Sequence, residues 1–425
     1  MTTQAPKGTY DILPNNPKEE WKSSFVWQQL EQTAKQIAFS YGFEEIRTPI
    51  FESLDLFSRS VGESSDIVSK EMYTFEDRAK RKLALRPEGT ACAARAFITN
   101  HLDQALPISK LFYIGPMFRY ERPQAGRFRQ HHQFGVEVFG SSSYLSDAEV
   151  ISMLYHFLTA LGLKDLTVLV HSLGDLECRK KYKEALVKYL TPLKNELSED
   201  SKKRLEHNPL RILDSKDETD QRLLKNAPKL MDFLSNASKE HFAKVCQLLE
   251  QLQIPYTIDN KLVRGLDYYT ETVFEIVTKD LGAQNTLGAG GRYDGLLKQL
   301  KGPDIPACGF ACGLERILQT MHNQSISLGK KQTPLLLLFP MNEDAFATAL
   351  YIANLLRTHN IAVDIDPRQK KMGQSIQFAE KRKIPYFSAI GDNEMNTKML
   401  TIKNLSNREE TQVEFKNLVT TLENL

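Results

Sequence analysis

The chain has 425 residues, enough for two or three domains, and its 41% hydrophobic and 25% charged residues are ordinary for a soluble globular protein. Its net charge of only +2 means that any nucleic-acid binding must come from local basic patches. Five cysteines without a Cys-x-x-Cys pair favour a reducing, cytoplasmic compartment, and the longest apolar run, LLLLFP, is too short to cross a membrane.

The first part of the chain alternates helix and strand signals. The segment from Pro17 to Tyr41 predicts a long amphipathic helix ended by Gly42, and FEEIRTPIFESLDLF predicts a strand, a break at Pro49 and a helix. Further predicted elements are a strand entering a helix through the turn RPEGT at residues 83–100, a β-hairpin at 111–140, a helix at 146–161 and a strand in LTVLVHSLG.

The composition changes in the middle of the chain. Between Cys178 and Gln253 glycine is nearly absent, lysine and glutamate are abundant, and apolar residues recur at helical spacing. We interpret residues 174–253 as a helical insertion into a first domain that spans residues 1–326. Strand-like sequence resumes with LVRGLDYYTETVFEIV and TLGAGGRYDGLL, and GFACG predicts a strand that runs into the helix LERILQTM.

The C-terminal part predicts a separate small domain. Residues 327–333 form a predicted linker, and residues 334–425 then alternate between apolar strands and amphipathic helices. Strands that alternate with crossover helices indicate a small, mostly parallel α/β domain.

The hairpin FRYERPQAGRFRQHHQFGVEVFG carries the densest polar pattern. Side chains alternate across a strand, so Gln133 and Glu137 share one face with Gly135, while Phe134, Val136 and Val138 share the other. Arginines hold phosphate and carboxylate groups bidentately, and this hairpin contains Arg119, Arg122, Arg127 and Arg129 beside Glu121. The pattern therefore predicts a site for a polar small molecule and a polyphosphate side by side.

Two other segments could complete such a site. In RPEGT, Glu88 with Gly89 and Thr90 could take an ammonium group, although Thr90 could equally be the N-cap of the following helix. In LVRGLDYY, Arg264 precedes Tyr268 and Tyr269, whose rings and hydroxyls could line a pocket. Taken alone, this second segment favours a strand with ordinary aromatic packing.

A fourth segment suggests an anion site. The glycines of GAGGRYDGL allow a ligand or a backbone to approach closely, and Arg316 lies in the first turn of its helix, where it could hold a phosphate. The alternative is a surface ion pair with Glu315 or another carboxylate. Cys308 and Cys312 are four residues apart, but no further metal-ligating pair lies nearby, so we interpret them as small buried residues. Together, the four segments predict binding of ATP and an amino acid, without a protein nucleophile or a metal-ligand cluster.

These motifs carry a resemblance to a known family. Over essentially its whole length the chain resembles histidyl-tRNA synthetases of the bacterial type, which are class II aminoacyl-tRNA synthetases. YGFEEIRTPIFESLDLF, the arginine-rich hairpin and GFACGLERIL resemble the three class II signatures, and LVRGLDYY and GGRYDGL resemble the two histidine-specific ones. The resemblance implies an α+β fold: an antiparallel sheet flanked by helices, a helical insertion over the tRNA acceptor stem and a C-terminal α/β anticodon-binding domain.

The resemblance also implies a reaction and its residues. Histidine and ATP, with Mg²⁺ carried on the phosphates, form histidyl-adenylate, and the histidyl group then passes to the 3′ end of the cognate tRNA. The implied ATP-binding residues are Arg119, Glu121, Arg127 and Arg316, with Arg264 and Arg119 catalytic. The implied histidine-binding residues are Glu88, Gly89, Thr90, Arg119, Gln133, Glu137, Arg264, Tyr268 and Tyr269. A homodimer is implied through the first signature.

Two rival functions remain open at this stage. A histidine-sensing regulatory paralogue of ATP phosphoribosyltransferase generally lacks the C-terminal domain and has degraded catalytic signatures, whereas this chain retains Arg264, Arg316 and about ninety residues beyond the linker. A synthetase for another amino acid is disfavoured by the intact LVRGLDYY.

Overall fold

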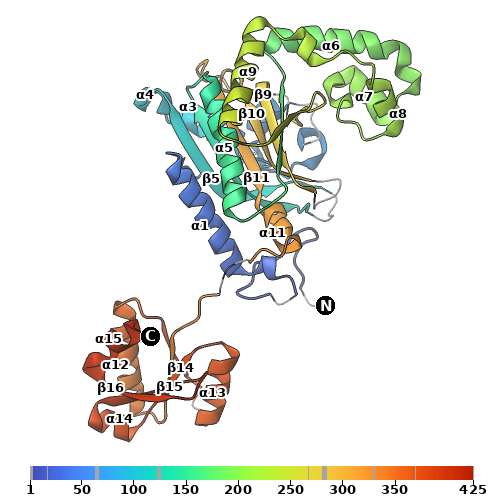
Figure 1. The fold of residues 1–425 in the computed structure, drawn as a ribbon. Helices are drawn as coiled ribbons and strands as arrows, with labels where there is room; N and C mark the ends of the chain where they lie inside the picture. The colour runs from blue at the N-terminus through green and yellow to red at the C-terminus, as the bar shows by residue number, and fades with distance from the viewer. Residues whose placement is uncertain are drawn as a thin grey trace. The chain divides into compact units, whose positions relative to one another are not determined.

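The computed structural model describes residues 3–16, 18–62, 67–121, 126–266, 268–279, 285–327, 329, 331–368 and 370–424. Arg122 of the hairpin loop and Asp267 of LVRGLDYY therefore lie outside the described residues. The chain divides into two compact units, residues 1–329 and 330–425 (Figure 1). Among the described helices, none has the length and apolar character needed to cross a membrane.

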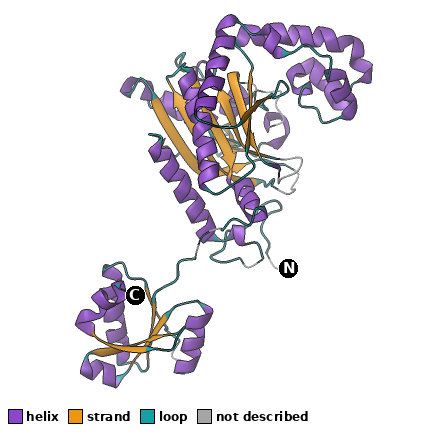
Figure 2. Cartoon of the chain, viewed as in Figure 1, coloured by secondary structure: helices purple, strands orange, loops and turns teal. Residues whose placement is uncertain are grey.

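A mixed, largely antiparallel sheet forms the centre of the first unit (Figure 2). Its strand order is β1-β5-β6-β11-β10-β9-β7-β8. The bounds are β1 (Glu44–Glu45), β5 (Ser109–Phe118), β6 (Gln130–Phe139), β7 (Thr167–Ser172), β8 (Tyr256–Ile258), β9 (Thr270–Val277), β10 (Thr286–Arg292) and β11 (Ala307–Gly313). Within the described part of this sheet, all inner pairs are antiparallel, and only the edge strands β1 and β8 pair in parallel with their neighbours. The predicted antiparallel sheet flanked by helices is confirmed.

One face of this sheet is covered by helices. They are α1 (Ser24–Ser40), α5 (Tyr144–Ala160), α9 (Asn236–Gln251) and α11 (Leu314–Asn323), and Figure 1 shows α1 and α5 lying along the strands. Phe134, Val136 and Val138 of β6 point into this apolar core, because alternate residues of a strand share a face. The predicted first helix begins only at Ser24, since Ser23 is extended and residues Glu20–Lys22 form a separate 3₁₀ turn.

The other face carries the shorter elements and the insertion. The shorter elements are α2 (Leu54–Val61), α3 (Thr90–Thr99), α4 (Leu102–Ala105), α10 (Leu296–Gln299) and the small sheet β2 (Phe51–Ser53), β4 (Lys82–Leu85) and β3 (Thr74–Glu76). The insertion contains α6 (Leu176–Leu190), α7 (Glu199–His207) and α8 (Glu218–Leu224) with intervening 3₁₀ turns, and α9 returns the chain to the sheet. Leu186 and Leu190 of α6 belong to the same apolar cluster as Val273 of β9.

The prediction of a strand through LVRGLDYYTETVFEIV is wrong for its first half, LVRGLDYY. Strand β9 begins at Thr270, and the described residues before it have no strand pairing. Their carbonyls bond to arginines of the insertion instead: Arg211 donates to Gly265 O at 3.0 Å, and Arg179 donates to Tyr269 O at 2.7 Å. A backbone whose carbonyls are taken by side chains need not join a sheet ladder.

The second unit has its own five-stranded sheet, in the order β13-β12-β14-β15-β16. Its elements are β12 (Leu336–Pro340), α12 (Ala345–Thr358), β13 (Val363–Ile365), α13 (Met372–Lys381), β14 (Tyr386–Ile390), α14 (Asp392–Thr397), β15 (Met399–Asn404), β16 (Glu410–Glu414) and α15 (Leu418–Glu423). The strands joined by α12 and α13 are parallel, as the alternation predicted, but β15 and β16 are antiparallel. The sheet is therefore mixed rather than mostly parallel: β15 runs antiparallel to β14, and β16 returns beside β15 after a short turn.

Candidate active site

A cavity of about 210 Å³ opens at the first unit's sheet, where β6, β10 and β11 meet the start of α11. It brings together residues predicted from four separate segments. Of these, Glu88, Thr90, Arg119, Glu121, Arg127, Gln133, Arg264, Tyr268, Tyr269 and Arg316 line the cavity. Gly89 and Glu137 belong to the wall behind that lining.

The face assignment made for strand β6 is confirmed. Gln133 lines the cavity and Glu137 lies deeper on the same face, fully buried, while Phe134 and Val136 lie in the core on the other side. Gly135 stands between the two polar residues. A side chain there would collide with the ring of Tyr113, which an added Cβ would approach to 2.4 Å. Glycine is therefore required for Tyr113 to lie beside Glu137.

Glu137 is held between two tyrosines. Tyr113 donates its hydroxyl to Glu137 Oε1 at 3.1 Å, and Tyr293 donates to Oε2. Burial raises the pKa of Glu137 to about 8, although the hydroxyl donors act in the opposite direction. The pattern of the sequence did not identify these two tyrosines as site residues. Tyr113 pairs with Gly135 across the hairpin, and that register was the signal that could have identified it.

Glu88 caps the helix that follows it. Its two carboxylate oxygens accept the backbone N–H groups of Thr90 and Ala91 at 2.7 and 2.9 Å. The alternative in which Thr90 is the N-cap is wrong, since Gly89 occupies that position and the capping carboxylate comes from Glu88. Burial raises the pKa of Glu88, while these N–H groups oppose the shift. Glu88 also lines the cavity.

Arg264 is paired with a carboxylate that sequence reasoning missed. Arg264 forms an ion pair with Glu275 of β9, and the other Glu275 oxygen accepts from Thr286 Oγ1 at 2.7 Å. The guanidinium also lies over the Tyr269 ring, 5.6 Å from its centroid. Burial alone would lower the pKa of Arg264, but Glu275 together with Tyr268 and Tyr269 outweighs burial and raises the pKa. The cation is therefore fixed in place before any substrate arrives.

The remaining arginines are held by backbone carbonyls and by Glu121. Arg119 donates to Pro87 O at 2.9 Å, and Arg316 donates to Gly126 O and Thr286 O at 3.3 and 3.0 Å. Arg127 lies 2.9 Å from a Glu121 oxygen. Burial, and then the neighbouring Arg127, lowers the pKa of Arg316, although Glu121 and Glu275 oppose the shift. The alternative of a surface ion pair with Glu315 does not hold, because Glu315 is only 2% exposed.

Neither cysteine chemistry nor a clustered metal site emerges from the described part of the chain. All five cysteines are buried thiols, including Cys308 and Cys312. Across the described ranges, no three His, Cys, Asp or Glu side chains gather as metal ligands.

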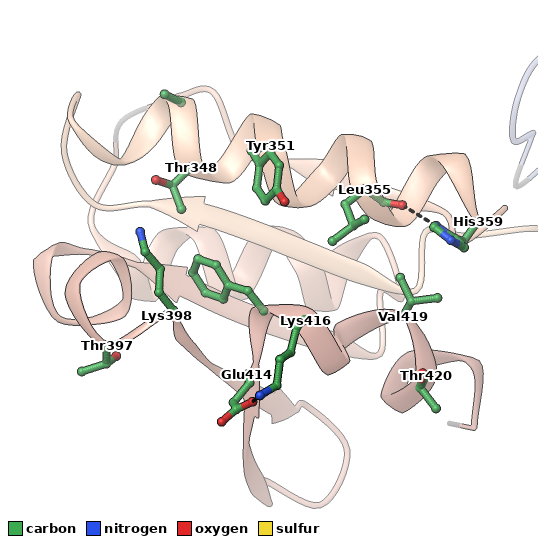
Figure 3. A pocket seen from close by; sticks show the side chains of 12 residues that line it. Thr348, Tyr351, Leu355, His359, Thr397, Lys398, Glu414, Lys416, Val419 and Thr420 are labelled. Carbon is green, nitrogen blue, oxygen red and sulfur yellow. Dashed lines mark hydrogen bonds and ion pairs between the residues drawn. The ribbon is translucent and has the colours of Figure 1, made fainter.

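A second, larger hollow of about 1100 Å³ lies in the C-terminal unit between α12, α15 and the end of β16 (Figure 3). Two of its lysines already have partners: Lys416 pairs with Glu414 at 2.7 Å, and the Lys398 ammonium lies 5.9 Å from the centroid of the Phe415 ring. No residue predicted from the sequence as part of a site lines this hollow.

Comparisons with known proteins agree with this geometry. The family model described as histidyl-tRNA synthetase matches residues 17–317, and the one described as an anticodon binding domain matches residues 336–425. A histidine–tRNA ligase from Protochlamydia amoebophila is 49% identical over 424 residues, covering all of both chains. One from Lactococcus lactis subsp. cremoris is 44% identical over 98% of this chain and 96% of that protein.

Solved structures show the same relationship. The crystal structure of apo histidyl-tRNA synthetase from S. aureus superimposes with a TM-score of 0.83 at 37% identity, covering 99% of this chain and 100% of that one. A Bacillus halodurans structure, described as an ATP phosphoribosyltransferase regulatory subunit/histidyl-tRNA synthetase, has a TM-score of 0.64 at 21% identity, covering 92% of this chain and 97% of that one, and shares the fold alone. The family-model match and the full-length identity place this chain in the histidyl-tRNA synthetase family.

Proposed function

We propose that the cavity carries both steps of histidine–tRNA ligation, the activity of this family of aminoacyl-tRNA synthetases. The observation that supports this most is the position of Glu137. A buried carboxyl between two tyrosine hydroxyls lies behind a cavity whose rim carries Arg119, Arg264 and Arg316. Such a carboxyl suits an imidazole N–H, and the arginines suit phosphates and a carboxylate.

Histidine would occupy the part of the cavity near Glu137. Glu88, Thr90 and Gln133 would take its ammonium group, and the buried Gln133 Oε1 accepts no hydrogen bond among the described residues. Glu137 and Tyr269 would form hydrogen bonds with the imidazole. The ring of Tyr268 packs beside that of Tyr269, with the two ring centroids 4.7 Å apart. A pocket that hydrogen-bonds a polar substrate group rejects analogues that lack the group, because its own polar atoms are then left unpaired.

ATP would occupy the arginine-lined part. Arg119 would hold the α-phosphate and the substrate carboxylate, Arg316 with Arg127 the γ-phosphate, and Glu121 would help place the nucleotide. Mg²⁺ usually binds through one or two carboxylates plus substrate phosphates, and it neutralises phosphate charge. Glu121 could take that role, because it lines the cavity and its Oε2 atom, paired with Arg127 at 2.9 Å, lies beside the arginines assigned to the phosphates.

The chemistry needs positioning and charge more than a protein nucleophile. The histidine carboxylate attacks the α-phosphorus, pyrophosphate leaves, and the terminal ribose of tRNA then attacks the adenylate carbonyl and releases AMP. Arg264, fixed by Glu275, would stabilise the charge that builds on the phosphorus oxygens during the first step. A preorganised cation of this kind loses nothing to reorganisation when the charge appears.

Two partners follow from the same assignment. The C-terminal unit would bind the anticodon of the tRNA for histidine, as its match to the anticodon-binding family suggests. A second copy of the chain would cover the small sheet, where Ile50, Phe51 and Phe75 are 45%, 53% and 42% exposed. The five buried, unpaired thiols suit the cytoplasm, where tRNA is charged.

A histidine-sensing regulatory subunit is not favoured. Such a protein has no need of a phosphate-side cation, yet Arg264 and Arg316 both line the cavity. The relatives with 43–49% identity over nearly the whole chain are histidine–tRNA ligases.

ATP–pyrophosphate exchange, measured with each amino acid in turn, tests the proposal. We expect exchange with histidine at least about a thousandfold more efficient than with any other amino acid. Transfer of labelled histidine to bulk tRNA should follow. Exchange that is absent with histidine, or equal with another amino acid, would refute the proposal.

A further inference from the structure

The N-terminal segment, which no signature includes, reaches the arginine-lined part of the cavity. Arg129 of the hairpin donates its backbone N–H to Gly8 O at 2.8 Å. Two residues later, the ring of Tyr10 meets the ring of Phe128 edge-on, with centroids 4.9 Å apart. Phe128 itself lines the cavity. Figure 1 shows the N-terminal segment near α11, whose first turn carries Arg316.

Tyr10 also meets a buried carboxylate at that first turn. Its hydroxyl donates to Glu315 Oε1 at 2.8 Å. Glu315 in addition accepts the backbone N–H of His132 at 2.9 Å and lies 2.9 Å from His132 Nδ1. Glu315 therefore joins three segments that are remote in sequence: the N-terminal segment, strand β6 and helix α11.

These contacts support the wall of the cavity at its arginine-lined part, which is assigned to ATP. The rings of Tyr10, Phe128 and Trp21 pack against one another. The centroid of the Trp21 ring lies 5.3 Å from that of Tyr10 and 5.9 Å from that of Phe128. Glu315 precedes Arg316, so its bonds fix the orientation of the helix start from which Arg316 projects. A buried carboxylate that loses a donor must find another or shift its surroundings, because an unsatisfied charge is costly. Burial, and then Glu315, raises the pKa of Tyr10, so its hydroxyl remains a donor across the physiological range.

We propose that Tyr10 is a positioning residue for ATP: through Phe128 and Glu315 it holds the part of the cavity that takes the nucleotide, without touching the substrates. This inference rests on the proposed function, because it uses the assignment of Arg127 and Arg316 to the phosphates. It predicts a selective effect. Loss of the Tyr10 hydroxyl should weaken ATP binding and leave histidine binding unaffected, since Glu88 and Glu137 are held by hydrogen bonds that do not involve Tyr10.

The test is Tyr10→Phe in the full-length chain. This change keeps the ring contact with Phe128 and removes only the hydrogen bond to Glu315. We expect the KM for ATP in histidine-dependent exchange to rise roughly three- to tenfold, as for one hydrogen bond. The KM for histidine and kcat should stay within about twofold of the unmodified chain.

Tyr256→Phe is the matched control. Tyr256 also donates its hydroxyl to a glutamate, Glu250 Oε1 at 2.7 Å, but this pair is exposed and lies outside the cavity lining. It should leave both KM values unchanged. Tyr10→Leu, which also removes the ring, should raise the KM for ATP more than Tyr10→Phe does.

Thermal melting separates positioning from general destabilisation. A purely structural role would lower the melting temperature and change the two KM values together, or neither. Equal KM values for Tyr10→Phe and the unmodified chain would overturn the inference, and so would a parallel rise in both. If the unmodified chain shows no histidine-dependent exchange, the proposed function fails and this inference fails with it.

Discussion

Removal of Arg264 tests whether its fixed charge serves the chemical step. The Arg264→Ala variant loses the guanidinium and leaves Glu275 without its ion-pair partner. Each of the two side chains is 18% exposed, so the pair is largely desolvated. Breaking a buried pair by removing one partner costs about 3 kcal/mol or more, because the other charge is left uncompensated. Some loss of stability is therefore expected together with the loss of activity.

The main effect of Arg264→Ala should be a lower kcat for pyrophosphate exchange. Loss of a preorganised donor at a developing charge lowers the rate by roughly a hundredfold to a thousandfold. We expect Arg264→Ala to reduce kcat for pyrophosphate exchange by that factor and to leave histidine affinity roughly intact. The exchange assay at saturating and limiting histidine separates the two constants.

A second substitution distinguishes the two effects. In the double variant Arg264→Ala/Glu275→Gln, the unpaired carboxylate is replaced by a neutral amide that can still bond Thr286, which donates to it at 2.7 Å. The double variant should recover most of the melting temperature and none of the rate. Glu275→Gln alone is the matched control. Normal turnover with only a raised KM, or recovery of rate in the double variant, would refute the reasoning.

Three further predictions concern other parts of the chain. Because the pKa of Glu137 rises from 4.5 to about 8 on folding, the stability that its protonated form contributes is complete below pH 4.5 and is lost as the pH rises through 8. In the substrate-free protein, the free energy of unfolding should therefore fall by about 1.4 kcal/mol per pH unit between those values, and Glu137→Gln should remove this slope. An equal dependence of the unfolding free energy on pH in the two proteins would contradict the prediction. Arg211→Ala breaks the 3.0 Å bond to the Gly265 carbonyl and should raise the KM for histidine roughly threefold to tenfold, whereas Arg222→Ala, in an exposed pair of the same insertion, should not. A chain of residues 1–329 should keep histidine-dependent exchange but charge tRNA poorly. Aminoacylation as efficient as that of the full chain would show that the C-terminal unit is not needed to recognise the anticodon.

The sequence by itself determined the features that follow from local geometry. The alternation of β6 placed Gln133 and Glu137 on one face, and the structure confirms this, because a strand of any register has a side-chain period of two. The glycine-poor, lysine-rich stretch indicated helices, and α6, α7, α8 and α9 lie within it. The signature residues were sufficient to suggest the family, because each combines a residue type with a spacing that the chemistry requires.

Only the tertiary structure decided which groups hold those residues in place. Tyr293 bonds Glu137 across 156 residues of sequence, Tyr113 bonds Glu137 across the β5–β6 hairpin, and Arg264 reaches Glu275 of β9 from the irregular segment before that strand. The same holds for Tyr10, which meets Glu315 across 305 residues of sequence. Local patterns cannot specify such partners, because the contact depends on how strands pair and how loops close. The loop before Thr270 is irregular for the same reason: the arginines that take its carbonyls come from the insertion.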